Sequence, residues 1–195
     1  MTAISAMENI HKRGLFGDHQ GKNENELINV SEVKHLQIIQ IVHYKKSTKQ
    51  IVSLNLDNLK FPEATMQVNS NKDTRILWSG PSNWLLVSTK KDILNSVQKI
   101  CDDKNFAVTD LSHSRAIIEL KGSNSKEVLK KGCPINLNEF KVNNCANSVF
   151  HGITITIDMI SNEPETLRIF ALRSFGESLY HSITDACLED GYQGI

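Results

Sequence analysis

The sequence contains no long apolar segment, no excess of either charge and no secretion signal. No stretch approaches the ~18 consecutive apolar residues that a membrane span requires. Lysine and arginine together number 22, and so do aspartate and glutamate, which gives a formal net charge of zero. This balance argues against a broad nucleic-acid surface, because affinity for phosphate comes mainly from Lys and Arg. The first twenty residues also lack the apolar core of a secretory signal. We therefore expect a cytoplasmic protein without a membrane or nucleic-acid partner.

Disulfide and metal-binding patterns are missing as well. The four cysteines are widely separated and include no CxxC pair: Cys101, Cys133, Cys145 and Cys187. Seven histidines are present, but no HxH or HxxxH spacing occurs. This spacing favours reduced, mostly buried thiols and disfavours a metal centre. No Gly-rich dinucleotide fingerprint is present either. Composition and spacing by themselves therefore indicate no active site.

The composition is that of a folded chain with one or two domains. Of its 195 residues, 39% are hydrophobic and 23% charged, which is enough for a core without disulfides or metals. Residues 1–33 differ from the rest, because they are polar and lack apolar periodicity. We interpret them as an extended or disordered arm, in which Leu15-Phe16 and Leu27-Ile28 are isolated apolar pairs that could anchor on a partner. The folded domain is expected over residues 34–195, in halves of about 34–104 and 105–195.

The first half begins with an apolar strand and ends with an amphipathic helix. Residues 36–44 are predicted as a strand, 47–58 as a weakly amphipathic helix or an irregular segment, and 65–69 as a short strand. Apolar runs at 75–78 and 84–87 flank five turn-forming residues, which predicts a hairpin. A helix is predicted next, because apolar residues recur at helical spacing at Ile93, Leu94, Val97, Ile100 and Cys101.

The second half repeats this order. Four strands are predicted, the third with strict apolar alternation, over residues 106–111, 116–120, 153–159 and 167–172. A short helix after Gly122 ends at Gly132-Cys133-Pro134, and a last helix with an apolar stripe over 175–187 ends before Gly191. The predicted fold class is α+β, with two similar βαββα-type halves of mostly antiparallel sheet covered by helices.

Two groups of side chains could carry chemistry. Asp110, Ser112 and His113 are the residue types of a nucleophilic triad, but they lie within four residues of one extended segment. Alternation along a strand places Asp110 and Ser112 on one face and His113 on the other, which favours a turn or an interface. Trp78 and Trp84 could stack on a flat ligand such as a pterin. Because they flank one hairpin, a role as core or interface anchors is favoured.

Several segments together resemble one known family. They are similar, in the same order, to segments of the gamma subunit of heterotetrameric sarcosine oxidase, and they lie at residues 77–87, 109–122, 128–137, 145–146 and 173–181. The first resembles the family's L-G-P-x-x-W-L-L hairpin. The third resembles its V-L-x-K-G-C-x-x-D-L run.

The resemblance implies a fold and a function. The fold would be similar to the folate-binding part of the glycine-cleavage aminomethyltransferase (T-protein). The chain would be a non-catalytic structural subunit in direct contact with the alpha subunit and assembled with the beta and delta subunits. The complex would oxidatively demethylate sarcosine to glycine, form hydrogen peroxide and pass the one-carbon unit to tetrahydrofolate. FAD, FMN, NAD, zinc and tetrahydrofolate would be held by the other subunits.

The resemblance assigns no catalytic, cofactor-binding or metal-binding residue to this chain. The candidate residues for a partner interface are Trp78, Trp84, His113, Arg115, Arg173 and Phe175. Two other functions stay open from the sequence. One is a free-standing folate-binding, one-carbon transferase-like protein, and the other is a small-molecule-sensing regulatory domain with a ferredoxin-like fold.

Overall fold

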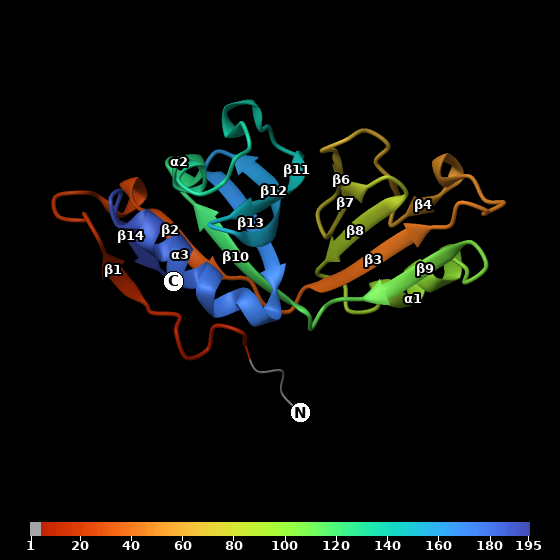
Figure 1. Cartoon of the computed structure of the whole chain (residues 1–195), viewed down its shortest axis with the longest axis horizontal. Helices are drawn as coiled ribbons and strands as arrows, with labels where there is room; N and C mark the ends of the chain where they lie inside the picture. Colours follow the sequence, from red (N-terminus) through yellow and green to blue (C-terminus); the bar gives the residue numbers. More distant parts are fainter. Residues whose placement is uncertain (1–4) are drawn as a thin grey trace. The chain divides into compact units, whose positions relative to one another are not determined.

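Two main β-sheets organise the chain, and each belongs to a separate unit. The computed structural model describes residues 5–195 (Figure 1). The first unit comprises the chain up to Lys34, Ser114–Val142 and Asn147–Ile195, and the second comprises His35–His113 and Asn143–Ala146. These units differ from the expected halves, 34–104 and 105–195. The reason is that residues 106–110 pair with residues 39–43 and so stay with the strands that precede them.

The second unit contains a five-stranded antiparallel sheet with the order β6-β7-β8-β3-β9. Its strands are β3 (Gln37–His43), β6 (Val68–Ser70), β7 (Thr74–Gly80), β8 (Asn83–Ser88) and β9 (Phe106–Asp110). Helix α1 (Ile93–Ile100) packs on one face of this sheet. Its buried residues Ile93 and Val97 join a core cluster with Ile39, Ile41, Ile76, Leu86 and Phe106. The helix predicted from its apolar spacing is thus present, as are the strands of this part.

Two connections in the second unit differ in detail from the sequence-based expectation. Residues 47–58, for which the sequence allowed a helix or an irregular segment, form no α-helix. A 3-10 turn (Ile51–Ser53) leads instead into a ribbon of β4 (Asn55–Leu56) and β5 (Leu59–Lys60). The β7–β8 hairpin is tighter than the expected five-residue loop, because the strands extend to the pair Gly80–Asn83.

The first unit contains a seven-stranded sheet with the order β1-β14-β2-β10-β13-β12-β11. The strands are β1 (Gly14–Phe16), β2 (Ile28–Glu32), β10 (Arg115–Lys121), β11 (Cys145–Phe150), β12 (Ile153–Asn162), β13 (Glu165–Leu172) and β14 (Tyr192–Gly194). The long central pairs β10–β13 and β12–β13 are antiparallel, whereas β14 pairs with β2 in parallel. Helices α2 (Ser125–Lys130) and α3 (Gly176–Cys187) contact each other and β13. Single 3-10 turns occupy Glu24–Glu26, Leu137–Glu139 and Arg173–Phe175.

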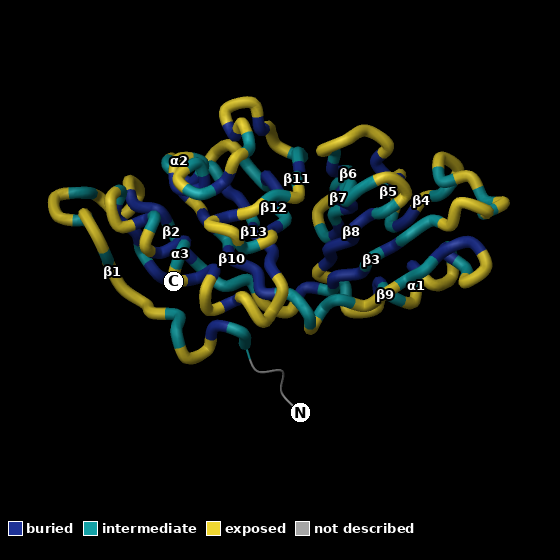
Figure 2. The backbone as a smooth tube through the Cα atoms, in the orientation of Figure 1, coloured by how far each residue is buried: buried dark blue, intermediate teal, exposed yellow. Residues whose placement is uncertain are grey.

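The core of the first unit follows the alternation in its sequence. Ile155, Ile157 and Met159 of β12 are buried, whereas Thr154 is exposed. Helix α3 buries Leu179, Ile183 and Cys187, as predicted, but Phe175 lies before the helix and is exposed. Figure 2 shows the buried residues concentrated in the central strands of each sheet.

The expectation of an N-terminal arm separate from the fold is wrong for residues 14–16, which form β1 and pair with β14, and for residues 27–33. Strand β2 lies inside the sheet, between β14 and β10, and Leu27, Ile28 and Val30 are buried. The arm begins to contact its own unit earlier, since Met7 is also buried. Three apolar residues are too few to give a periodic signal, so β2 depends on partners that are distant in sequence. Residues 1–4 of the expected arm lie outside the described residues.

Strands β11 and β14 were not predicted, because neither has a clear apolar alternation. The two predicted halves also differ in content, with one α-helix in the second unit and two in the first among the described residues. No helix within residues 5–195 is long and apolar enough to cross a membrane. All four cysteines are buried, and burial raises the pKa of Cys101 to about 11 and that of Cys187 to about 12.

Candidate functional site

The segment with the triad-like residue types forms a turn at the end of β9. The backbone N–H and the hydroxyl of Ser112 both donate to Oδ1 of Asp110, over 2.9 and 2.6 Å. The same hydroxyl oxygen accepts a 3.0 Å hydrogen bond from the N–H of Ile38. These bonds from Ser112 hold the pKa of the Asp110 carboxyl below its ordinary value. The Ser112 proton is therefore directed to a carboxylate that is two residues away, while His113 is exposed. This geometry is that of an Asx-type turn, in agreement with the favoured interpretation.

The two tryptophans lie directly opposite each other on β7 and β8 but have different environments. Trp84 is 4% exposed, its Nε1 donates to the carbonyl of Pro62 over 2.8 Å, and its ring meets Phe61 edge-on. Its selection as an interface residue is therefore corrected: Trp84 is a core residue, because its indole is buried and its N–H is satisfied, and only its small exposed part lines a pocket. Trp78 is only half-buried. It contributes to a shallow pocket of about 360 Å³.

Arg115, Arg173 and Phe175 come together at one end of the sheet of the first unit. Arg115 begins β10 and lies opposite Leu172, the last residue of β13. The N–H of Arg173 donates to the carbonyl of Ser114 over 2.8 Å, which holds the following 3-10 turn against β10. Leu172 and Phe175 are both 45% exposed. We call Arg115, Leu172, Arg173 and Phe175 the Arg115–Phe175 patch.

Arg115 is the charged member of this patch with the least access to water. Its side chain is partly buried, and burial lowers the pKa of its guanidinium. Within residues 5–195, Arg115 forms no ion pair. The patch therefore combines two exposed apolar side chains with a partly desolvated cation, which suits contact with a protein that carries a carboxylate. His113 is exposed but belongs to the second unit.

Metal-ligating clusters and shallow cavities are the remaining features that bear on small-molecule binding. Among residues 5–195, no group of three or more His, Cys, Asp or Glu side chains could hold a metal ion. Two further shallow cavities occur. One of about 500 Å³ lies along α3 beside Tyr192, and one of about 370 Å³ lies between α1 and β9. The sequence did not reveal either cavity, because their walls combine residues from elements that only the fold brings together.

Comparison with known proteins places these features in a family. The model of the sarcosine oxidase, gamma subunit family (SoxG) matches residues 47–189. The chain belongs to this family. The resemblance inferred from the five sequence segments is thus confirmed.

Two curated members of the family come from Corynebacterium. The sarcosine oxidase subunit gamma of strain U-96 is 30% identical over 119 residues, which cover 60% of this chain and 57% of that protein. The subunit gamma of strain P-1 is 28% identical over 123 residues, which cover 62% and 60%. The matched stretch therefore spans less than two thirds of either relative.

Two solved structures share the fold. A chain of the heterotetrameric sarcosine oxidase from Corynebacterium sp. U-96, in complex with pyrrole 2-carboxylate, superimposes with a TM-score of 0.82 and 23% identity, over 95% of this chain and 96% of that one. The glycine cleavage system aminomethyltransferase T from Bartonella henselae superimposes with a TM-score of 0.61 and 12% identity, over 82% of this chain and 46% of that one. The predicted α+β, aminomethyltransferase-like fold of mostly antiparallel sheets is confirmed.

Proposed function

We propose that this chain is the non-catalytic gamma subunit of a heterotetrameric sarcosine oxidase. The observation that carries the proposal is the family match over residues 47–189. The assembled enzyme would demethylate sarcosine oxidatively to glycine, form hydrogen peroxide and pass the one-carbon unit to tetrahydrofolate. The structural similarity to a chain of such an enzyme over 95% of the length supports the same kind of assembly.

In this proposal the chemistry takes place on other subunits. The alpha, beta and delta subunits are the partners, and FAD, FMN, NAD, zinc and tetrahydrofolate are bound there, in the cytoplasm. The Asp110–His113 segment supports a structural role for this chain, because its serine hydroxyl is hydrogen-bonded within a turn. Ser112→Ala and His113→Ala are accordingly expected to leave sarcosine turnover of the assembled complex within a few-fold, since loss of a true base or nucleophile costs about a hundredfold or more.

The Arg115–Phe175 patch is the proposed contact with the alpha subunit, with Trp78 and His113 as further contacts. Burying Leu172 and Phe175 would remove apolar surface from water, and a carboxylate of the partner would compensate the partly desolvated guanidinium of Arg115. A glutamate at position 175 would replace the apolar ring by a charge that must be desolvated, and it would repel the partner's carboxylate and compete with it for Arg115.

Co-expression tests the proposal directly. The chain is produced with the alpha, beta and delta subunits encoded in the same genome, and the eluted complex is assayed for sarcosine-dependent oxygen uptake. We expect the four proteins to elute together, and activity or solubility to decrease when this chain is omitted. Separate elution of this chain, with full activity of the remaining subunits, would contradict the proposal.

A matched pair of variants tests the patch. Phe175→Glu is expected to decrease co-elution at least about tenfold, equivalent to about 1.4 kcal/mol. Leu188→Glu replaces a similarly exposed apolar residue, 43% against 45%, at the other end of α3 and should have no such effect. Equal behaviour of the two variants would exclude the patch as the contact.

A free-standing folate-binding protein is the second candidate, favoured by the structural similarity to the aminomethyltransferase. Titration calorimetry of the isolated chain with tetrahydrofolate distinguishes the two. The gamma-subunit proposal predicts no binding heat from the isolated chain, whereas stoichiometric binding would favour the second candidate.

A further inference from the structure

The two edge strands of the five-stranded sheet in the second unit differ in whether another segment forms hydrogen bonds to them. At the β6 edge, residues 143–145 cover the strand: the N–H of Val68 donates to the carbonyl of Asn143, and the N–H of Cys145 donates to that of Met66, each over 2.8 Å. Gln67 and Asn144 also form a bridge there. At the other edge, β9 is the last strand of the sheet. The fold thus covers one edge and leaves the other uncovered.

The uncovered edge presents a regular set of peptide groups. The N–H of Leu111 donates to the carbonyl of Ile38 over 2.7 Å, and the carbonyl of Asn105 accepts from the N–H of Tyr44 over 2.9 Å. In an antiparallel pair such residues alternate, so the odd-numbered residues of β9 bond to β3 and the even-numbered ones point away. The outward groups include the N–H and carbonyl of Val108 and the N–H of Asp110. Among residues 5–195, nothing in the fold forms a hydrogen bond to the two peptide groups of Val108.

Strand β9 has little of the usual protection of an exposed edge, since its one charged residue, Asp110, is its last residue. Natural sheets guard such edges with lysine, proline or a bulge, because an unpaired ladder recruits another strand. The sequence of β9 is Phe-Ala-Val-Thr-Asp, and its register with β3 is continuous over all five residues. An edge of this length, with a charge only at its end, is suited to receive another strand.

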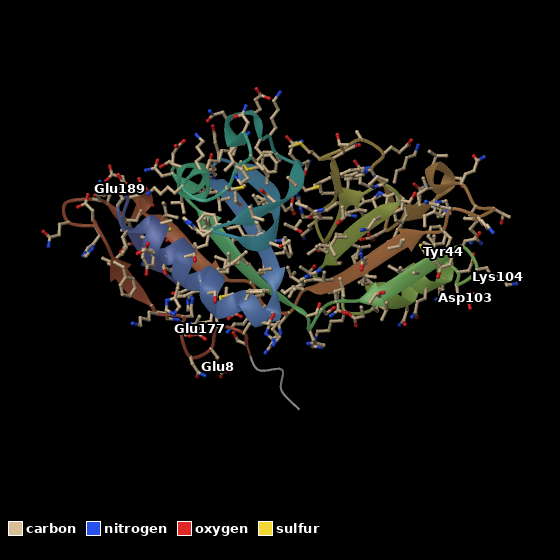
Figure 3. All side chains as sticks on the ribbon, viewed as in Figure 1. Glu8, Tyr44, Asp103, Lys104, Glu177 and Glu189 are labelled. Carbon is tan, nitrogen blue, oxygen red and sulfur yellow. The ribbon has the colours of Figure 1, made fainter. Side chains whose placement is uncertain are left out.

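A cavity of about 370 Å³ lies beside this edge. Its walls come from α1, β9 and the turn that joins them: Gln98, Cys101, Asp102, Asp103, Phe106 and Val108. Figure 3 shows the side chains of Asp103 and Lys104 at the start of β9. Phe106 and Val108 alternate on the face that packs toward α1. A strand added next to β9 would place every second side chain on this same face, beside the cavity.

We propose that the outer edge of β9 receives an extended segment of a partner subunit as a sixth strand, with one basic side chain of that segment in the cavity, beside the carboxylate of Asp103. The proposal rests on the proposed function, because it requires a partner subunit. The peptide groups of Val108 would fix the main chain of the segment, and the cavity would select its side chain.

The charge of the edge argues for a different protein rather than a second copy of this chain. In a symmetric antiparallel pair of two β9 strands centred on Val108, Asp110 of one copy would lie opposite Phe106 of the other. That register would bring a carboxylate toward an apolar ring and toward the carboxylate of Asp103, whereas Asp102 is already paired with Lys49. Like charges and an uncompensated burial both disfavour this pairing.

The test uses proline at Val108. The N–H of Val108 points away from β3, so Val108→Pro removes only the outward donor and keeps the bonds within the sheet. Val108→Ala is the matched control, because it shortens the side chain but keeps the N–H. A second pair examines the cavity: Gln98→Trp fills it, whereas Asn95→Trp places the same side chain at an exposed position of α1 that does not line it.

Each tagged variant is co-expressed with the alpha, beta and delta subunits, and the recovered partner is quantified by gel densitometry. Circular dichroism and a thermal melt of each variant alone confirm that it folds. We expect Val108→Pro and Gln98→Trp to decrease the recovered partner at least about tenfold, and both controls to recover it as the wild type does. Hydrogen exchange of residues 106–112 should slow in the wild-type complex relative to the isolated chain.

The outcomes separate the two proposals. Recovery of the partner by a folded Val108→Pro variant, or unchanged exchange at β9, would overturn the strand addition and leave the subunit role intact. Failure of the wild-type chain to recover any partner would overturn the subunit role itself. A dimer of the isolated wild-type chain in light scattering, lost in Val108→Pro, would assign the edge to a second copy and overturn the choice of a partner subunit.

Discussion

Asp190 connects the end of α3 to α2 and to the N-terminal segment. Its carboxylate accepts from Asn124 Nδ2 and from Lys131 Nζ, each over 3.0 Å, and its carbonyl accepts from Lys22 Nζ over 3.1 Å. A single residue in the turn that follows α3 thus connects both ends of α2 to the N-terminal segment. The bonds from Asn124 and Lys22 are partly buried, and 21% of the Asp190 side chain is exposed. Such charge-assisted bonds stabilise more than exposed pairs do.

Asp190→Ala is therefore expected to lower the free energy of unfolding by about 2 kcal/mol, measured by urea denaturation. Its neighbour Glu189 is the matched control. Glu189 also pairs with Lys131 at 3.0 Å, but its side chain is 82% exposed. Glu189→Ala should cost less than about 0.5 kcal/mol. Equal losses in the two variants would show that burial does not set the strength of these pairs.

The opposed tryptophans give a second prediction at the residue scale. Trp84→Phe leaves the Pro62 carbonyl without its donor and creates a cavity in the core. We expect a loss of about 2–3 kcal/mol in the free energy of unfolding. Trp78→Phe, at the half-buried position across the same hairpin, should cost less than about 1 kcal/mol. If Trp78→Phe were the more damaging variant, the assignment of Trp84 to the core would be incorrect.

At the scale of elements, the end of α3 depends on a glycine that the sequence had indicated. Gly191 has a φ of +73°, and a Cβ there would lie 2.5 Å from the carbonyl oxygen of Asp18. The residue therefore meets two demands, a left-handed backbone and close contact with the N-terminal segment.

Gly152 allows these two demands to be separated, because its φ is +84° and a Cβ there would meet nothing within 4 Å. Gly152→Ala should cost about 1 kcal/mol for the backbone alone. Gly191→Ala should cost about 3 kcal/mol, since the chain must also move away from the new methyl group. Thermal melts of both variants measure the difference. Similar melting temperatures would mean that the segment at Asp18 moves away from the new methyl group with no loss of stability.

At the scale of the whole molecule, the buried thiols make the stability dependent on alkaline pH. The pKa of Cys101 is raised to about 11 and that of Cys187 to about 12, mainly by burial. In the unfolded chain these thiols ionise near pH 8.5. Between these values the folded chain keeps protons that the unfolded chain releases. The contribution of these thiols to the free energy of unfolding is therefore fully present below about pH 8.5 and decreases as the pH rises.

We expect the urea midpoint to fall between pH 8 and pH 10, and the fall to be smaller in Cys187→Ala than in the wild type. The comparison uses the change between the two pH values within each protein, so the packing loss of the variant cancels. A fall of the same size in both proteins would assign the alkaline sensitivity to other groups.

The sequence determined the elements whose pattern is local. The alternation of β12, the helical spacing of α1 and the turn residues between β7 and β8 each predicted the observed element, because every signal lies within about ten consecutive residues. The family segments likewise identified the chain as a sarcosine oxidase gamma subunit family member. For the same reason, the turn interpretation of Asp110–His113 agreed with the structure: its bonds mostly join neighbours in the chain.

The tertiary structure decided what depends on partners far apart in sequence. Ile28 and Val30 belong to a strand only because β10 and β14 bond to it on both sides. β9 joins β3 rather than the strands that follow it, which moved the boundary of the units. Trp78 and Trp84 have the same residue type and the same hairpin, yet only the packing of Phe61 and Pro62 against one of them distinguishes core from surface. Pairing and packing between segments that are distant in sequence are properties of the folded chain, and no local pattern encodes them.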